Sequence, residues 1–168
     1  MIILKITKVI VGELDTNCYI LSKNKKCIVI DPGDCYDKIK NAIGNDEIVA
    51  VIVTHYHFDH IGALKEFSPE LVLDRNNLKE KEYNIGDFCF DVMYTPGHKE
   101  DSISIYLKKE EIMFTGDFLF KGTIGRTDLP GGNNIDMFES LKKISKYDKN
   151  IKIYPGHGDE TYLKNEFD

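Results

Sequence analysis

The stretch from Ile48 to His60 constrains the fold of this chain more than any other part of the sequence. Residues 48–53, IVAVIV, are apolar throughout, which predicts a central strand that is covered on both faces. The next seven residues, THYHFDH, contain three histidines and one aspartate. The chain must therefore fold so that the end of a buried strand carries a group of side chains that are typical metal ligands.

The spacing within this stretch predicts which side chains share a metal ion. Alternate residues of extended backbone point the same way, so His55 and His57 can bind one cation. Asp59 and His60 are expected to follow a turn and to face a second cation. An isolated H-x-H pair is a weak signal. Four potential ligands within six residues at the end of a buried strand are a much stronger one.

The remaining ligand candidates also follow predicted strands. His98 ends the sequence TPGH, His157 lies in YPGHG after the last predicted strand, and Asp117 ends the sequence FTGD. All five histidines of the chain are therefore predicted to lie in loops at strand ends. The alternative is five unrelated histidines that cap helices or face solvent, and the shared context of the five disfavours it.

Seven ligands suit two divalent cations. One cation can take three imidazoles and keep a position open for water, the second can take one carboxylate and two imidazoles, and Asp117 can bridge the two. The corresponding residues are His55, His57 and His98 for the first cation, and Asp59, His60 and His157 for the second. Imidazole and carboxylate ligands suit zinc, which we expect here, and they also suit iron and manganese.

Elsewhere the sequence alternates between strand and helix patterns. Ile135, Phe138, Leu141 and Ile144 recur at helical spacing. The overall pattern predicts sheets packed together, with helices outside them. The predicted strands cover residues 2–11, 17–21, 27–30, 48–53, 88–94, 102–107, 112–115 and 151–154, the predicted helices cover residues 36–43, 61–67 and 135–144, and residues 122–133 form a glycine-rich loop.

Length and composition narrow the class of protein. A chain of 168 residues suits one domain, residues 1–168, with a sizeable core. The net charge of −6 argues against a nucleic-acid partner. No apolar run approaches the ~20 residues that a membrane span needs, and no secretory signal is visible, so we expect a cytoplasmic protein. The four cysteines form no C-x-x-C pair and are predicted to be buried free thiols.

These motifs resemble those of a known superfamily. T-H-x-H-x-D-H, the D-P-G that begins at Asp31, T-P-G-H, T-G-D and the late G-H look like the five motifs of the metallo-β-lactamase superfamily. The resemblance implies an α+β fold, a four-layer αββα sandwich with the metals at one edge of the sheets. It also implies metal-ligand roles for the seven residues above. Asp31 would lie behind the ligands, or belong only to the turn.

Within the superfamily, the chain resembles the short glyoxalase II-like hydrolases, which cleave thioesters of the hydroxyacylglutathione type. F-T-G-D-F-L-F, G-R-T-D, P-G-G and Y-P-G-H-G-D-E-T carry this resemblance. Full-length glyoxalase II continues into a helical C-terminal region that helps to hold glutathione. This chain ends eleven residues after His157. We therefore expect no such glutathione-binding domain.

The ligands and the resemblance together predict a mechanism. Two cations that share a water lower its pKa toward ~7, and the resulting hydroxide attacks the thioester carbonyl of a small-molecule substrate. Asp59 and Asp117 are the predicted catalytic residues, because Asp59 can orient the nucleophile and Asp117 can join the metals. Arg126, in the glycine-rich loop, either holds a substrate carboxylate or is a solvated loop residue.

Three alternatives remain open from the sequence. Persulfide dioxygenases also resemble this chain, and in them a single iron uses the equivalents of His55, His98 and Asp117. A lactonase of the same superfamily is the second alternative. The third is a non-catalytic metal-binding module, which seven ligands with an open coordination position disfavour. The physiological substrate and the oligomeric state are not determined by the sequence.

Overall fold

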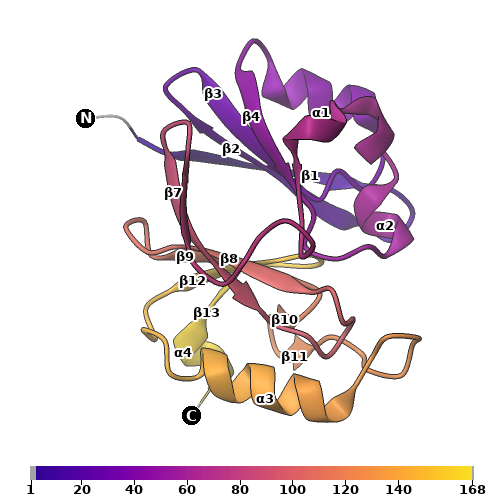
Figure 1. Ribbon diagram of the computed structural model, residues 1–168, viewed down its shortest axis with the longest axis vertical. Helices are drawn as coiled ribbons and strands as arrows, with labels where there is room; N and C mark the ends of the chain where they lie inside the picture. The colour runs from indigo at the N-terminus through magenta and orange to yellow at the C-terminus, as the bar shows by residue number, and fades with distance from the viewer. Residues whose placement is uncertain (1–2, 168) are drawn as a thin grey trace.

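Two mixed β-sheets lie face to face in the computed structural model, which describes residues 3–167 (Figure 1). Antiparallel pairs and parallel pairs occur in both sheets. In the first sheet, β3 and β4 are parallel, and in the second, β9 and β12 are parallel. The first sheet has the order β1 (Lys5–Val11), β2 (Thr16–Lys23), β3 (Lys26–Ile30), β4 (Glu47–Ile52) and β5 (Val72–Leu73). The second has the order β13 (Thr161–Tyr162), β12 (Lys152–Pro155), β9 (Ile112–Gly116), β8 (Ile103–Leu107), β7 (Phe88–Tyr94) and β6 (Glu82–Ile85).

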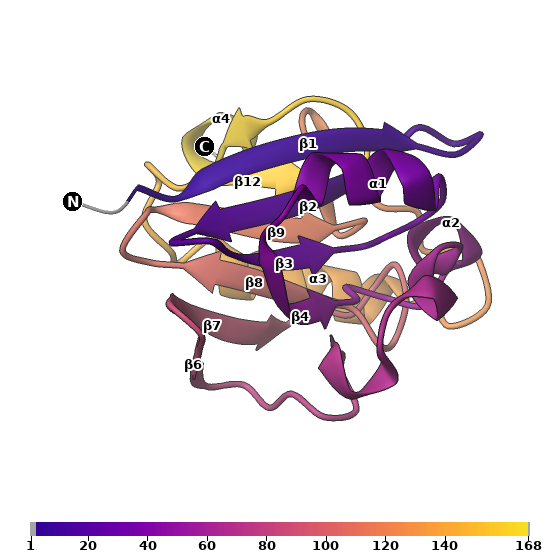
Figure 2. The same ribbon diagram turned by 90° about the horizontal axis from the view of Figure 1, so that it is seen from above.

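Helices cover the outer faces of the two sheets. Helix α1 (Tyr36–Ile43) lies outside the first sheet, and α3 (Asn134–Ile144) lies outside the second (Figures 1 and 2). This arrangement confirms the predicted four-layer αββα sandwich of the α+β class. The smaller elements are α2 (Phe58–Ile61), the 3-10 helices η1 (Leu64–Glu66) and η2 (Pro69–Leu71), the hairpin of β10 (Leu119–Phe120) with β11 (Thr123–Ile124), and α4 (Leu163–Glu166).

The alternation of side chains along the strands explains the layers. In β3, Ile28 and Ile30 enter the apolar cluster between the two sheets. Cys27 and Val29 point the other way and pack in a second cluster with Ile39 of α1. A third cluster lies between the second sheet and the helices α3 and α4. Each strand near the centre is therefore apolar on both faces, which is why these strands read as continuous apolar runs.

Most predicted strands are confirmed, and four expectations are wrong in whole or in part. The loop predicted for residues 122–133 contains the short strand β11, which pairs with β10. The predicted helix over residues 61–67 is replaced by α2, which starts at Phe58, and by the 3-10 helix η1. Gly62 ends α2 where the chain crosses close to other backbone, because a Cβ there would lie 2.2 Å from the carbonyl oxygen of Gly33. His60 therefore lies in a helix and not in a strand-end loop.

The cysteine prediction holds for only two of the four residues. Cys18 and Cys27 are buried, and burial raises the pKa of Cys27 to about 12. Cys35 and Cys89 are exposed, because Cys35 precedes α1 at the surface and Cys89 lies on the outward side of β7. Of the strand predicted for residues 2–11, β1 confirms residues 5–11, and residue 2 lies outside the described residues.

The topology brings several strand ends to one edge of the sandwich. The strands β3 and β4 run in the same direction in the first sheet. In the second sheet β7, β9 and β12 share one direction, because β8 is antiparallel to both β7 and β9. Residues that follow these five strands therefore meet at the same edge.

Within residues 3–167, the helices are all too short or too polar to cross a membrane.

Candidate metal centre

Both sheets supply side chains to one cluster at this edge. His55 and His57 follow β4, and Asp59 and His60 belong to α2. From the second sheet, three residues follow β7, β9 and β12, namely His98, Asp117 and His157. The structure thus brings together all seven residues that the sequence singled out as metal ligands. Whether they bind metal stays a prediction.

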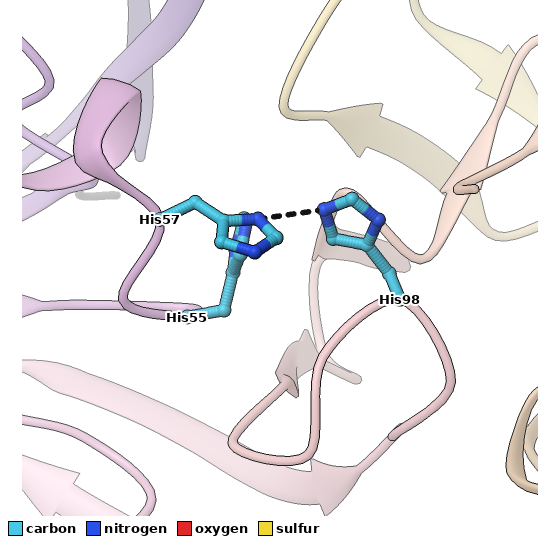
Figure 3. Close-up of side chains that lie close together, drawn as sticks. All are labelled: His55, His57 and His98. Carbon is cyan, nitrogen blue, oxygen red and sulfur yellow. Dashed lines mark hydrogen bonds between the residues drawn. The ribbon is translucent and has the colours of Figure 1, made fainter. Parts of the chain in front are cut away.

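Three histidines form the first group of potential ligands. One ring nitrogen of each of His55, His57 and His98 lies within 4.8 Å of the others. Figure 3 shows the three rings turned toward one another, and His57 Nδ1 is 2.9 Å from His98 Nε2. Imidazole nitrogens are zinc ligands, and three of them gathered in this way match the three-histidine sets of catalytic zinc sites.

The second group combines two carboxylates with two imidazoles. Asp59, His60, Asp117 and His157 each offer an atom within 4.8 Å of the others. Asp59 Oδ2 lies 3.1 Å from His157 Nε2 and 3.4 Å from His60 Nε2. This is the set of ligands expected for the second cation, with Asp117 added.

Asp117 lies between the two groups. Its Oδ2 is 3.6 Å from His55 Nε2, 3.5 Å from His98 Nε2 and 3.3 Å from His157 Nε2. Its Oδ1 is 3.2 Å from His60 Nε2. A single carboxylate therefore reaches nitrogens of both groups, which is the geometry that a bridging ligand requires.

Contacts behind the ligands decide which ring nitrogen faces the centre. His60 Nδ1 is 2.7 Å from Asp31 Oδ2, and His98 Nδ1 is 2.8 Å from the carbonyl oxygen of Arg126. His157 Nδ1 is 3.1 Å from the carbonyl oxygen of Leu14. In all three residues Nε2 is left for the centre. Contacts of this kind fix the tautomer and orientation of metal-binding histidines.

Asp31 lies behind the ligands, one of the two positions that the sequence allowed. Its Oδ1 accepts a hydrogen bond from the Thr54 amide, and its Oδ2 accepts one from the Thr54 hydroxyl. Asp31 is buried and has a φ of 55°, a conformation that non-glycine residues adopt only occasionally. This backbone turn aims the carboxylate at His60 and at the start of the His55 segment.

The absence of a side chain at Gly156 leaves the space that the cluster occupies. A Cβ at this position would lie 2.3 Å from Asp117 Oδ1 and 2.8 Å from His60 Cε1. The glycine is held on both sides, since its amide donates to the Gly116 carbonyl and its carbonyl accepts from the Asn17 amide. The glycine before His157 is therefore needed for the ligands themselves and not only for the turn.

Residues at the start of β2, in the first sheet, form hydrogen bonds that hold the His157 loop, which follows β12 of the second sheet. Asn17 Nδ2 donates to the carbonyl oxygens of Pro155 and Gly158, at 3.0 Å and 2.9 Å. The hydroxyl of Thr16 donates to Asp59 Oδ2 at 3.0 Å. These roles could not be predicted from the sequence, because the partners are more than forty residues apart along the chain.

The electrostatics of the two groups differ. Burial lowers the pKa of His55, His57 and His98, so these rings are held neutral, as ligands must be. Burial also opposes charge on His157, but the carboxylates of Asp117 and Asp59 overcome it and raise its pKa to about 10.

The pKa values of the two carboxylates in the second group are lowered. Burial opposes charge on Asp59, but hydrogen bonding to His157 outweighs it and lowers the pKa to about 2. The pKa of Asp117 is also held well below its usual range by its imidazole neighbours, against the effect of burial. The two carboxylates of the second group are therefore ionised, and neighbouring carboxylates raise the pKa of both His60 and His157 against the effect of burial, so a bound cation would take the place of the protons on these two imidazoles.

Buried atoms without partners test whether the cluster fits a metal. His55 Nε2, His60 Nε2 and Asp117 Oδ1 are buried and have no hydrogen-bond partner among the described residues. Unpartnered buried polar atoms are costly and need an explanation. All three point into the cluster, and all three belong to residue types that bind zinc, iron or manganese. The residues present therefore fit a divalent metal site.

An open cavity of about 510 Å³ leads from solvent to the cluster. His57, Asp59, His98, Asp117 and His157 reach it. Arg126, the predicted substrate-binding residue, also lines it. The remaining wall residues had no predicted role in the sequence analysis, although two of them are neighbours of potential ligands along the chain. They are Leu14, Phe58, Lys99, Leu129 and Pro130.

Comparisons with known proteins agree with this site. The sequence profile of the Metallo-beta-lactamase superfamily matches residues 11–73 and 66–157. A probable metallo-hydrolase of Bacillus subtilis, YqgX, is 32% identical over an alignment of 194 positions, which covers 94% of this chain and 92% of that protein. A hydroxyacylglutathione hydrolase of Francisella tularensis subsp. novicida is 30% identical and matches 83% of this chain but only 61% of its own length.

Solved structures of similar proteins superpose closely. The B3 metallo-beta-lactamase BLEG-1 has a TM-score of 0.90 at 29% identity, with 96% of each chain covered. TTHA1623, solved in a di-iron-bound form, has a TM-score of 0.85 at 28% identity, with 95% of this chain and 96% of that chain covered. ETHE1 from Myxococcus xanthus has a TM-score of 0.86 at 29% identity, with 96% of this chain and 81% of that chain covered.

Proposed function

This chain belongs to the metallo-beta-lactamase superfamily, and we propose that it is a metal-dependent hydrolase that cleaves thioesters of the hydroxyacylglutathione type, in which a hydroxyacyl group is carried on a thiol. The observation that carries the proposal is the convergence of seven ligand side chains at the inner end of an open cavity. The similarity to a hydroxyacylglutathione hydrolase supports the choice of substrate class.

The residues would hold two divalent cations in the two groups described above, with Asp117 between them. Bound there, the cations would supply Lewis acidity, which polarises a carbonyl group and lowers the pKa of water. We expect zinc from the ligand types. The di-iron-bound form of TTHA1623 makes iron the first alternative to test.

The protein side chains have distinct tasks in this proposal. Asp59 lies in the cavity wall and its low pKa, about 2, keeps it ionised at neutral pH, so it can accept a hydrogen bond from the attacking water and orient it. The Thr16 hydroxyl and His157 hold that carboxylate in place. Thiols have a pKa near 8.5, so a thiolate leaves without help from a strong general acid.

The proposal is tested by a matched panel of substrates. Metal-loaded protein is assayed with one hydroxyacyl group as a thioester and as an oxygen ester, together with a lactone and a β-lactam. We expect the thioester to have the highest kcat/KM and Asp117→Asn to abolish most of that activity. A higher kcat/KM for the lactone or the β-lactam would overturn the substrate assignment and leave the hydrolase class intact.

One specific observation favours a second candidate. Asp117 Oδ2 lies about equally far from His55 Nε2 and His98 Nε2, at 3.6 Å and 3.5 Å. Two histidines and one carboxylate are the ligand set of many mononuclear iron oxygenases. A persulfide dioxygenase would use this set, and ETHE1 is among the similar structures. The buried, unpartnered His60 Nε2 favours two metals instead.

Metal analysis separates these two candidates. Protein purified without added metal is assayed for metal content, oxygen uptake and thioester hydrolysis. About two metals per chain with no oxygen uptake agrees with the hydrolase. One iron per chain, with oxygen consumed and sulfite formed from a persulfide, would establish the dioxygenase.

A further inference from the structure

Apolar side chains gather at the mouth of the catalytic cavity. Leu14, Phe58 and Leu129 line it and are 52%, 76% and 37% exposed. They come from the β1–β2 turn, the start of α2 and the loop before α3, which are far apart in the sequence. Within residues 3–167 nine large apolar side chains are exposed, and these three of the nine share one cavity. Exposed apolar residues that cluster in this way mark a binding surface.

The cations in the same wall are already paired. Arg126 donates two hydrogen bonds to Asp128, from Nε at 2.7 Å and from Nη2 at 2.9 Å. Lys99 Nζ lies 3.4 Å from Asp101 Oδ1 and 3.6 Å from Glu100 Oε1. The two cations of the wall thus face three neighbouring carboxylates, and these five groups together have a net charge of −1 (2 − 3) before the ligand carboxylates are counted.

This charge balance weakens recognition of an anionic substrate. Exposed ion pairs are weak, so a substrate can displace them. A substrate carboxylate that approached Arg126 would, however, replace Asp128 with a group of the same charge, and little would be gained. Among the described residues that line the cavity, Arg126 and Lys99 are the only two with permanent positive charge.

We propose that the mouth of this site selects a thioester whose thiol part is uncharged and apolar, and that Asp128 acts against thiols that carry carboxylates, glutathione among them. The proposal rests on the thioesterase function proposed above and specifies the thiol carrier. Leu14, Phe58 and Leu129 would contact the thiol part, and the cation of Arg126 would remain with Asp128. Each buried methylene group of the thiol then contributes about four-fold in affinity.

The test keeps one hydroxyacyl group and varies the thiol. The thioesters of glutathione, of N-acetylcysteamine and of benzyl mercaptan are compared by kcat/KM on metal-loaded, full-length protein. We expect the benzyl thioester to exceed the glutathione thioester by at least about ten-fold, because several of its carbons can be buried. A glutathione thioester that is equal or better would overturn the inference and leave the thioesterase function standing. Failure of all three thioesters would overturn the thioesterase function and this inference together.

Three variants test the residues. Asp128→Asn frees the guanidinium of Arg126 and should raise the ratio of glutathione to benzyl activity by up to about five-fold. Leu129→Gln should raise the same ratio by lowering benzyl activity. Ile135→Gln changes an exposed apolar residue of α3 that is not among those lining the cavity. It is the control for replacing any exposed apolar side chain with a polar one, and it should leave the ratio unchanged.

Binding of uncleavable analogues gives a readout that is independent of turnover. The dissociation constants of S-benzyl and S-glutathionyl thioethers are measured by calorimetry on the wild type and on Asp128→Asn. We expect the wild type to bind the benzyl thioether more tightly than the glutathione thioether. We expect Asp128→Asn to tighten the binding of the glutathione thioether and to leave that of the benzyl thioether unchanged. Equal effects of Asp128→Asn on both ligands would refute a role of this carboxylate in selecting charge.

Discussion

Replacing Gly156 with alanine should remove metal without straining the backbone. The added Cβ would lie 2.3 Å from Asp117 Oδ1 and 2.8 Å from His60 Cε1. Gly156 is not among the glycines with a positive φ, so alanine can adopt its conformation. The perturbation is therefore mainly a collision with two potential ligands, with a weaker contact at 3.1 Å to the carbonyl carbon of Gly116.

The size of the effect follows from these distances. To reach an ordinary contact of 3.4 Å from 2.3 Å, either the carboxylate or the loop must move by about 1 Å (3.4 − 2.3). The loop is fastened by the hydrogen bonds of Gly156 to Gly116 and Asn17, so we expect Asp117 to move. Metal–ligand distances tolerate about 0.2 Å, and a 1 Å misplacement at a catalytic site can cost about 100-fold in rate.

The assay compares metal content, activity and stability. Gly156→Ala should bind less than one metal per chain after dialysis, lose at least about 100-fold in kcat/KM and, through overpacking, lose about 1–3 kcal/mol of unfolding free energy. Gly44→Ala is the control, because its φ of 64° costs alanine about 1–2 kcal/mol while its Cβ meets no atom within 4 Å. A Gly156→Ala variant that is destabilised like the control, but keeps its metals and activity, would refute the reasoning.

Four further predictions follow from the same contacts. His157→Ala should lose mainly the second of two metals, and a dialysed variant that keeps both would contradict the assignment. Asp117→Asn should lower activity by at least ~100-fold, the usual scale for a group that organises transition-state charge, whereas a few-fold loss would make Asp117 structural. Asn17→Ala removes two hydrogen bonds, to the carbonyl oxygens of Pro155, which keeps the Tyr19 hydroxyl, and of Gly158, and at about 0.5–1.5 kcal/mol each should cost about 1–3 kcal/mol in urea unfolding, with stability equal to the wild type as the contrary result. Chelation should lower the unfolding temperature by roughly 5–10 °C per metal removed, for a metal present at about 100 times its Kd, and an unchanged melting curve of verified apo-protein would argue against a metal that joins the sheets.

Four of the potential ligands could be predicted because they lie close together in the sequence. His55, His57, Asp59 and His60 lie within six residues, and the apolar run before them announces a buried strand. The continuous apolar run likewise predicted β4, which packs against the apolar clusters on both of its faces. The four-layer fold came from the resemblance of the motifs, because periodicity alone does not give the order of strands in a sheet.

The contacts behind the ligands could not be predicted because they are distant in sequence. Leu14 and His157 are 143 residues apart, and Asn17 and Gly158 are 141 residues apart. The start of α2 was also missed, because a four-residue helix is too short to show a helical period. The pairing of Arg126 with Asp128 depends on loop conformation, so the sequence left the role of Arg126 open.

The distribution of ligands between the sheets links metal binding to folding. In the first group, His55 and His57 follow the first sheet and His98 follows the second; the second group is divided in the same way between α2 and the ends of β9 and β12. Neither group exists until the two sheets are packed. Hydrogen bonds of Asn17, and of the Ile103 amide to the Thr54 carbonyl, join the two sheets at this edge. A cation in either group therefore binds the folded state far better than the unfolded chain, and its binding energy adds to the stability of the packed sheets.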